Sequence, residues 1–343
     1  MPALRSERAE ERPRPVSRWR MRLGSVELLV VVVLLAVLLR GRLLDLSASA
    51  SVSTFVTVFV SVVVAGLPFL VLGAFASAAL VTFVPRRPLD RLLTLPAAAV
   101  VPAAAAAGVL APLGDDATEV AAGPLRPASR PRGRRDPATA GAAAFLLAST
   151  VVNPVVLVAT AVAFPGQPMM VLARLFAGLL ASLGMGWLWL ALGRPEWLAV
   201  ANATRRFPSG SGWPAFWERC RLDVVRAGGF LVLGALAVAV LTAWAPSRWL
   251  DAIGGSGAFA VVAMALLAVL LSVRGGPDAF VAAALSQFPA TARLAFLIVG
   301  PTANLRLFTQ QVARFGPRFA LRFAPATLVV GLLCAAVVGV VLL

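Results

Sequence analysis

The sequence predicts an all-α, polytopic integral membrane protein built from two internal repeats with broken helices, and three observations support this fold class. Hydrophobic residues make up 60% of the 343-residue chain and charged residues only 13%, which is outside the range of soluble proteins. Apolar stretches of membrane-helix length recur along the chain. The hexapeptide Phe69–Ala74 returns letter for letter as Phe230–Ala235, and 13 of the 22 positions from Phe69 to Asp90 are identical at an offset of 161. Such duplication inside an apolar chain is typical of transporters.

The predicted elements begin with a basic tail. Residues 1–23 form a disordered cytoplasmic tail, and residues 24–40 form a leading transmembrane helix. A cleaved secretory signal is less favoured, because Arg40, Arg42 and Asp45 stand between this apolar stretch and the Ala48-Ser49-Ala50 sequence that would be cut. The remaining divisions are repeat unit 1 at residues 52–194, a central cytoplasmic loop at 195–221 and repeat unit 2 at 222–343.

Each repeat unit contains five apolar segments. They cover 53–84, 92–112, 113–123, 139–164 and 169–192 in unit 1, and 222–245, 258–273, 278–288, 291–299 with its continuation, and 324–343 in unit 2. The positive-inside rule assigns the arginine-rich loops and the N-terminus to the cytoplasm. Five passes per unit predict inverted repeats, with roughly nine to eleven membrane segments in the whole chain. Segments 113–123 and 278–288 are short, about 17 Å if helical, and if neither crosses we expect parallel repeats instead.

The repeat pairs four polar residues with one another. Asp116 corresponds to Asp278 at an offset of 162, and Asn153 corresponds to Asn304 at an offset of 151. All four stand where Gly or Pro interrupts an apolar segment, and broken helices expose backbone groups that a substrate can satisfy but lipid cannot. A carboxylate at this depth is costly and marks a candidate functional site. We therefore predict a substrate- or ion-binding site formed by Asp115, Asp116, Asn153, Arg274, Asp278 and Asn304.

A structural interpretation of the same residues stays open. Asp278 would cap the helix that follows it and pair with Arg274, while Asp115 and Asp116 would lie at an aqueous end. Asn153 would satisfy the backbone of a broken helix rather than contact a ligand.

Several motifs carry a family resemblance. They are Pro277–Ala283, Leu294–Leu297 leading to Gly300-Pro301, and Phe145–Ser149 leading to Asn153-Pro154. Over roughly residues 52–343 the chain resembles the predicted permease family that includes the trivalent organoarsenical permeases. The resemblance implies a permease, and the chain would be a divergent member of that family. Asp115–Ala117 and Val273-Arg274 stand where relatives carry cysteines, and Asn304 and Arg306 stand where relatives tend to carry Asp and Lys. Soft metals would lack thiolate ligands here, so trivalent arsenic is not the expected substrate.

Composition also restricts partners and chemistry. The chain contains no His, and Cys220 and Cys334 lie far apart, so we predict no metal site and no cofactor. The net charge of +16 comes from arginines between apolar runs, which favours a membrane over nucleic acid. The predicted partners are membrane lipids and a small-molecule or ion substrate, and a homo-oligomer is possible.

The sequence favours a secondary permease of the cytoplasmic membrane rather than an enzyme. It would move a small solute by alternating access, with Asp116 and Asp278 as ion or proton carriers. One alternative is a membrane-embedded enzyme that acts on lipid-linked substrates through Asp115, Asp116 and Glu119. Another is a passive channel or a subunit of a larger complex.

Overall fold

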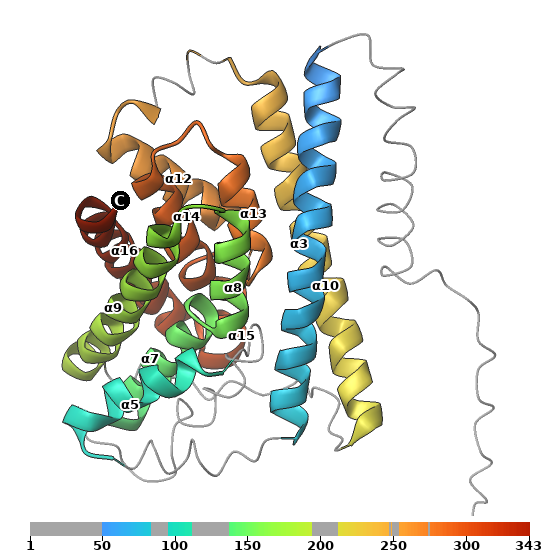
Figure 1. Ribbon diagram of the computed structural model, residues 1–343. Coiled ribbons are helices and arrows are strands. Elements are labelled where there is room, and N and C mark those ends of the chain that lie inside the picture. The colour runs from blue at the N-terminus through green and yellow to red at the C-terminus, as the bar shows by residue number, and fades with distance from the viewer. Residues whose placement is uncertain are drawn as a thin grey trace, which may run out of the picture.

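The computed structural model describes residues 50–83, 95–111, 137–193, 212–246, 248, 254–273 and 275–343. Within these ranges the regular elements are α-helices (Figure 1). They are α3 (Ala50–Phe83), α5 (Ala97–Val109), α7 (Pro137–Val151), α8 (Pro154–Ala163), α9 (Pro168–Leu192), α10 (Trp213–Trp244), α12 (Ala258–Leu271), α13 (Pro277–Ala284), α14 (Ala290–Thr302), α15 (Leu305–Phe315) and α16 (Pro317–Leu342). The predicted tail 1–23 and leading helix 24–40 lie outside the described residues.

Among the described residues, five helical stretches are long and apolar enough to cross a membrane. They are α3, α9, α10, α16 and the consecutive helices α7 and α8, which together cover Pro137–Ala163. The shortest has 25 residues, or about 38 Å, against a hydrocarbon thickness of about 30 Å. The chain is therefore a multi-pass membrane protein. α5 and α12, with 13 and 14 residues, reach only about 20 Å and do not span alone.

The helices α3 and α10, which carry the repeated hexapeptide, pack side by side and antiparallel (Figure 1). Phe55 near the start of α3 contacts Trp244 at the end of α10, with ring centroids 5.4 Å apart. At the other end, Phe83 contacts Trp213 at 5.5 Å. Gly66 permits close packing between them, because a Cβ at this position would lie 3.0 Å from a methyl group of Leu231.

The start of α10 differs from the prediction. This helix begins at Trp213, inside the stretch 195–221 that was predicted as loop. Phe216 explains the difference, because its side chain is buried and its ring contacts the rings of Phe75 and Phe83 on α3. Tertiary packing thus stabilises helical turns whose charged residues, by hydropathy alone, indicate a loop.

The remaining long helices form a bundle beside this pair (Figure 1). α9 and α16 run antiparallel, because Trp189 near the end of α9 contacts Phe319 and Phe323 near the start of α16, at 5.0 and 5.4 Å. α9 also packs closely against α7, and α16 packs closely against α14. Glycines mark both interfaces: Gly178 and Gly186 of α9 meet α7, and Gly331 and Gly339 of α16 meet α14.

The helices α12 and α13, with the chain reversal between them, form a short helical hairpin. α13 has only eight residues, or about 12 Å. The chain before α12 lies beside the chain after α13, because a Cβ on Gly254 would lie 2.9 Å from the carbonyl oxygen of Gln287. The reversal uses left-handed backbone at Ser272 (φ 53°) and Gly275 (φ 75°). Segments 258–273 and 278–288, which we listed as separate passes, contain helices of only 14 and eight residues, and neither is long enough to span the hydrocarbon core alone.

Candidate functional site

Asn153 joins two helices at a break in the backbone. It is the N-cap of α8, and its side-chain oxygen accepts a hydrogen bond from the backbone N–H of Val156 at 3.1 Å. Its Nδ2 donates to the carbonyl oxygen of Ser149, in the last turn of α7, at 2.8 Å. One buried amide thereby satisfies both a donor of the new helix and an acceptor of the old one.

Asn304 makes the corresponding contacts between α14 and α15. Its Nδ2 donates to the carbonyl oxygen of Gly300 at 2.6 Å, and its Oδ1 accepts from the backbone N–H of Leu307 at 2.7 Å. The partners lie four residues before and three residues after the asparagine, as they do for Asn153. The two residues that the repeat paired therefore serve the same backbone role. This geometry explains both asparagines without a ligand, although Asn153 also lines a cleft described below.

We expect Asn153→Ala and Asn304→Ala each to lower the free energy of unfolding by about 1–3 kcal/mol, because each change removes a cap and leaves buried backbone groups unpaired. Denaturant unfolding of the purified chain in one detergent, followed by circular dichroism, measures this effect. Thr309→Ala is the matched control, since its exposed hydroxyl donates only to the carbonyl oxygen of Arg306. Asparagine variants as stable as this control would contradict the capping role.

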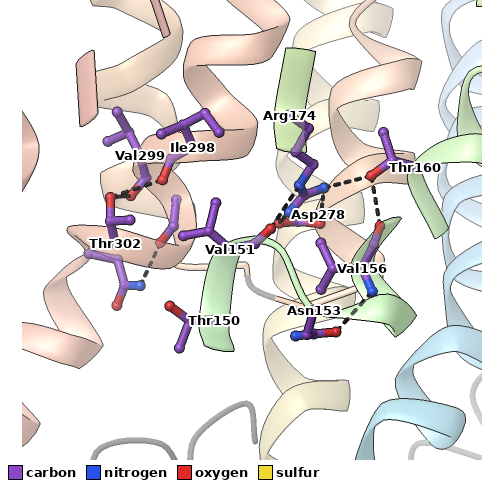
Figure 2. Close-up of polar contacts among 12 residues, drawn as sticks. Thr150, Val151, Asn153, Val156, Thr160, Arg174, Asp278, Ile298, Val299 and Thr302 are labelled. Carbon is purple, nitrogen blue, oxygen red and sulfur yellow. Dashed lines mark hydrogen bonds and ion pairs between the residues drawn. The ribbon is translucent and has the colours of Figure 1, made fainter. Parts of the chain in front are cut away.

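Asp278 lies in the first turn of α13 and is fully buried. Its partner is Arg174 of α9, which is also fully buried and lies 104 residues away in the sequence. The guanidinium contacts the carboxylate with both terminal nitrogens: Nη2 lies 2.6 Å from Oδ2 and Nη1 lies 3.2 Å from Oδ1 (Figure 2). Such a two-point ion pair fixes the orientation of both groups.

Arg174 also donates hydrogen bonds to both helices on either side of the break between α7 and α8. Its Nε donates to the carbonyl oxygen of Val151, the last residue of α7, at 3.2 Å. Its Nη1 donates to the hydroxyl of Thr160 in α8 at 2.9 Å, and that hydroxyl donates to the carbonyl oxygen of Val156 (Figure 2). Arg174 therefore connects α7, α8 and, through Asp278, α13.

Helix dipoles favour both charges of the Arg174–Asp278 ion pair. The cation of Arg174 lies at the C-terminal end of α7, where the helix dipole is negative. The anion of Asp278 lies in the first turn of α13, where the dipole is positive. A buried ion pair adds little net stability, because removing two charges from water is costly. Its presence at interrupted helices inside a membrane protein is thus typical of a functional element.

Sequence reasoning missed Arg174 and chose Arg274 as the neighbour of Asp278. Arg174 is the only charged residue between Met169 and Leu192, and this isolated charge was the available signal. The structure assigns Arg174 as the ion-pair partner of Asp278, whereas Arg274, Asp115 and Asp116 lie outside the described residues. Among the described residues, no group of three or more His, Cys, Asp or Glu side chains is arranged to hold a metal ion.

A cleft of about 690 Å³, open solvent at its mouth included, lies between the α3/α10 pair and the interrupted helices. It is bordered by α3, by the first turn of α8, by α10, by the linker between α12 and α13, and by α15. Its lining residues include Phe69, Asn153, Val156, Asp223, Ala227, Phe230, Gly276, Pro277 and Arg306. Pro277 lies on the cleft wall, and the next residue, Asp278, is in the buried ion pair. The cleft and the ion pair are therefore adjacent.

Charged groups lie at the cleft as well. Asp223 of α10 and Arg306 of α15 both line it. The guanidinium carbon of Arg306 lies 4.7 Å from the centre of the Phe230 ring, a cation–π distance. Arg226 of α10 is close enough to repel the charge of Arg306, while Asp223 attracts it.

The chain is similar to proteins that are described as permeases. A family model described as "Predicted permease" matches residues 51–340. The chain is 26% identical over 203 residues to a Streptococcus mutans protein named "Putative two-component membrane permease complex subunit", an alignment covering 57% of this chain and 67% of that protein. It is 25% identical over 280 residues to the UPF0718 protein YcgR of Bacillus subtilis, covering 80% of this chain and 93% of that protein. No solved structure matches.

Proposed function

Because the chain belongs to the predicted permease family, we propose that it is a secondary permease that moves a small solute across the cytoplasmic membrane by alternating access. The observation that carries this proposal is the buried Arg174–Asp278 ion pair, which lies at interrupted helices beside a cleft. In our proposal the cleft is the substrate pathway, and the ion pair couples its opening to an ion or proton.

The proposal includes inverted repeats, and the direction of the helices supports them. α3 and α10 carry the same hexapeptide and run antiparallel, and the final helices of the two halves, α9 and α16, also run antiparallel. In our proposal the α12–α13 hairpin adds no crossing, and unit 2 crosses three times, through α10, through α16 and through the consecutive helices α14 and α15, which are not among the five long apolar stretches. Among the described residues, the helices of unit 1 that correspond to these three are α3, α7 with α8, and α9. An odd number of crossings turns the second unit upside down even when short segments do not cross.

Charge indicates which end faces the cytoplasm. The arginine-rich segments follow α3 and α9 and precede α7 and α10, so they leave the bundle at the end where Phe83 contacts Trp213. The positive-inside rule assigns this end to the cytoplasm. The opposite end includes the uncharged turn at residues 164–167. The cleft lies in the half of α3 nearer to the cytoplasmic end, at residues 69–77, and we infer that solute enters it from the cytoplasm.

The ion pair supplies a coupling step in this proposal. A proton or cation that binds Asp278 cancels the charge that holds Arg174, and Arg174 then loses its anchor on α13. The hairpin α12–α13 is then free to move relative to α7, α8 and α9. Asp116, the repeat mate of Asp278, retains its proposed role as a second carrier. The Streptococcus mutans relative is named as a subunit of a two-component permease complex, which supports a partner subunit as a further part of the proposal.

Cysteine accessibility tests alternating access without a known substrate. Ala227→Cys, placed on the cleft wall in a Cys220→Ala/Cys334→Ala background, is exposed to a membrane-impermeant maleimide in spheroplasts and in inside-out vesicles. We expect fast labelling from the arginine-rich side and slower, measurable labelling from the opposite side, because the cleft opens to each side in turn.

Two control cysteines calibrate the sidedness. Gln167→Cys lies in the exposed turn between α8 and α9, and Arg318→Cys lies in the exposed first turn of α16 at the arginine-rich end. Each should react from one side only. Labelling of Ala227→Cys from one side alone, under all conditions, would contradict alternating access. Equally fast labelling from both sides would favour a passive channel.

A further inference from the structure

The walls of the cleft combine aromatic surface with positive charge. The rings of Phe69 and Phe230 line it on α3 and α10. Arg306 lines it on α15, with its guanidinium over the Phe230 ring. A flat apolar surface beside a guanidinium suits a solute that has an apolar body and one charged group.

The balance of charge around the cleft favours an anion. Arg306 and Arg226 are close enough to repel each other, and Asp223 is the acidic side chain that interacts with Arg306. Among the described residues, two cations and one anion thus interact at or near the cleft. Asp278 does not change this balance, because Arg174 neutralises it within the protein interior. An incoming anion would relieve the repulsion between the two arginines.

Helix direction adds to this charge. The cleft wall includes Asn153 and Val156 from the start of α8, Gly276 and Pro277 from the start of α13, and Arg306 from the first turn of α15. The first turns of three helices therefore contribute residues to the wall of one cleft, where helix dipoles are positive. Interrupted helices in transporters present such ends to anionic substrate groups.

We propose that the cleft binds a small organic anion, with Arg306 holding the anionic group and Phe69 and Phe230 contacting the apolar body. This inference rests on the proposed permease function and names its substrate class. None of the described lining residues carries a thiol, so a soft metal has no ligand among them. Guanidinium groups bind carboxylate, sulfonate and phosphonate through the same paired N–H geometry, so the anionic group can be any of these.

The test uses five probes that share a phenyl ring. Benzoate, benzenesulfonate and phenylphosphonate are the anions, benzamide is the neutral match and benzylammonium is the cationic match. The purified full-length protein in lipid nanodiscs is heated with each probe, and tryptophan fluorescence gives the midpoint of unfolding. At least one anion should raise this midpoint with increasing concentration, while benzamide and benzylammonium should leave it unchanged.

Variants identify the site. Arg306→Gln should weaken anion binding by about ten- to hundredfold, as expected for the loss of a charge-assisted contact. Arg318→Gln, an exposed arginine on α16, should leave binding unchanged. If Arg306→Gln fails to fold, protection of Ala227→Cys against maleimide by the anions, and not by benzamide, gives the same information with Arg306 in place.

The outcomes separate this inference from the permease proposal. Anions that stabilise the protein no better than benzamide, or an unchanged response in folded Arg306→Gln, would overturn the anion site. Preferential binding of benzylammonium would also overturn it. None of these results affects the two-sided labelling of Ala227→Cys. Loss of that labelling would instead overturn alternating access.

Discussion

Arg174→Met is expected to lower the free energy of unfolding by about 3–5 kcal/mol, because it leaves the buried carboxylate of Asp278 without a compensating charge. Methionine keeps the apolar length of the arginine side chain, so the effect reports mainly on the guanidinium. The change also removes the donor to the carbonyl oxygen at the end of α7. Asp278→Asn should have a loss of similar size, since it leaves Arg174 charged and unpaired.

The double variant Arg174→Met/Asp278→Asn, referred to below as the pair-neutral variant, separates charge from packing. It contains no buried charge at this site, so we expect it to be more stable than either single variant, with a coupling energy of at least about 2 kcal/mol. It should stay below the wild type by about 1–3 kcal/mol, because the carbonyl group of Val151 loses its donor.

A charge swap provides a sharper control. Arg174→Asp/Asp278→Arg keeps both charges but places each at the wrong helix end, an anion at the C-terminus of α7 and a cation at the N-terminus of α13. The swapped pair should therefore fail to restore wild-type stability. Denaturant unfolding of the four variants in one detergent measures the whole set. Additive losses in the pair-neutral variant, with no coupling, would contradict a direct interaction between the two side chains.

The sequence placed Asn153 and Asn304 at helix interruptions, where both are N-caps, because this information is local. Their substrate- or ion-binding role stays a prediction. The partners of Asn153 and Asn304 are backbone groups three and four residues away, and the same spacing recurs in the repeat. The choice between a structural and a ligand role needed hydrogen-bond geometry, which a sequence does not contain. The structure supplies that geometry and accounts for both residues as helix caps.

The partner of Asp278 was beyond the reach of local reasoning. Arg274 is close in sequence, whereas Arg174 is on another helix in the other half of the chain. The repeat did not indicate Arg174 either. When α9 is aligned with α16 through the glycine pairs Gly178/Gly331 and Gly186/Gly339, the position of Arg174 corresponds to Thr327, which has no charge. A comparison of the two repeat units detects residues that both units share, so it does not detect a cation that is present in only one of them.

Helix ends were predicted least well, because packing decides them. Hydropathy assigned the start of α10 to a loop, but Phe216 packs against α3 and extends the helix. It also assigned two passes to a region that forms the α12–α13 hairpin, where Ser272 and Gly275 reverse the chain. Apolar length alone does not show where packing and left-handed backbone end a helix.

The response of cleft opening to the coupling ion should depend on the Arg174–Asp278 ion pair. In the wild type, a higher concentration of the coupling ion, whether a proton or a cation such as Na⁺, neutralises Asp278 more often and releases Arg174 more often. The cleft should then open to the opposite side more often, and labelling of Ala227→Cys from that side should become faster. In the pair-neutral variant no charge remains to be neutralised, so the labelling rate should no longer respond to that ion.

The most direct measurement is the labelling rate of Ala227→Cys from the opposite side, recorded across a pH series and an Na⁺ series in wild-type and pair-neutral proteins of verified fold. Gln167→Cys, exposed on that side, corrects for the pH dependence of the thiol reaction itself. We expect a rate that rises with one of the two ions in the wild type and a flat rate in the pair-neutral variant. An unchanged ion dependence in the pair-neutral variant would contradict the role of Arg174 and Asp278 as the coupling element.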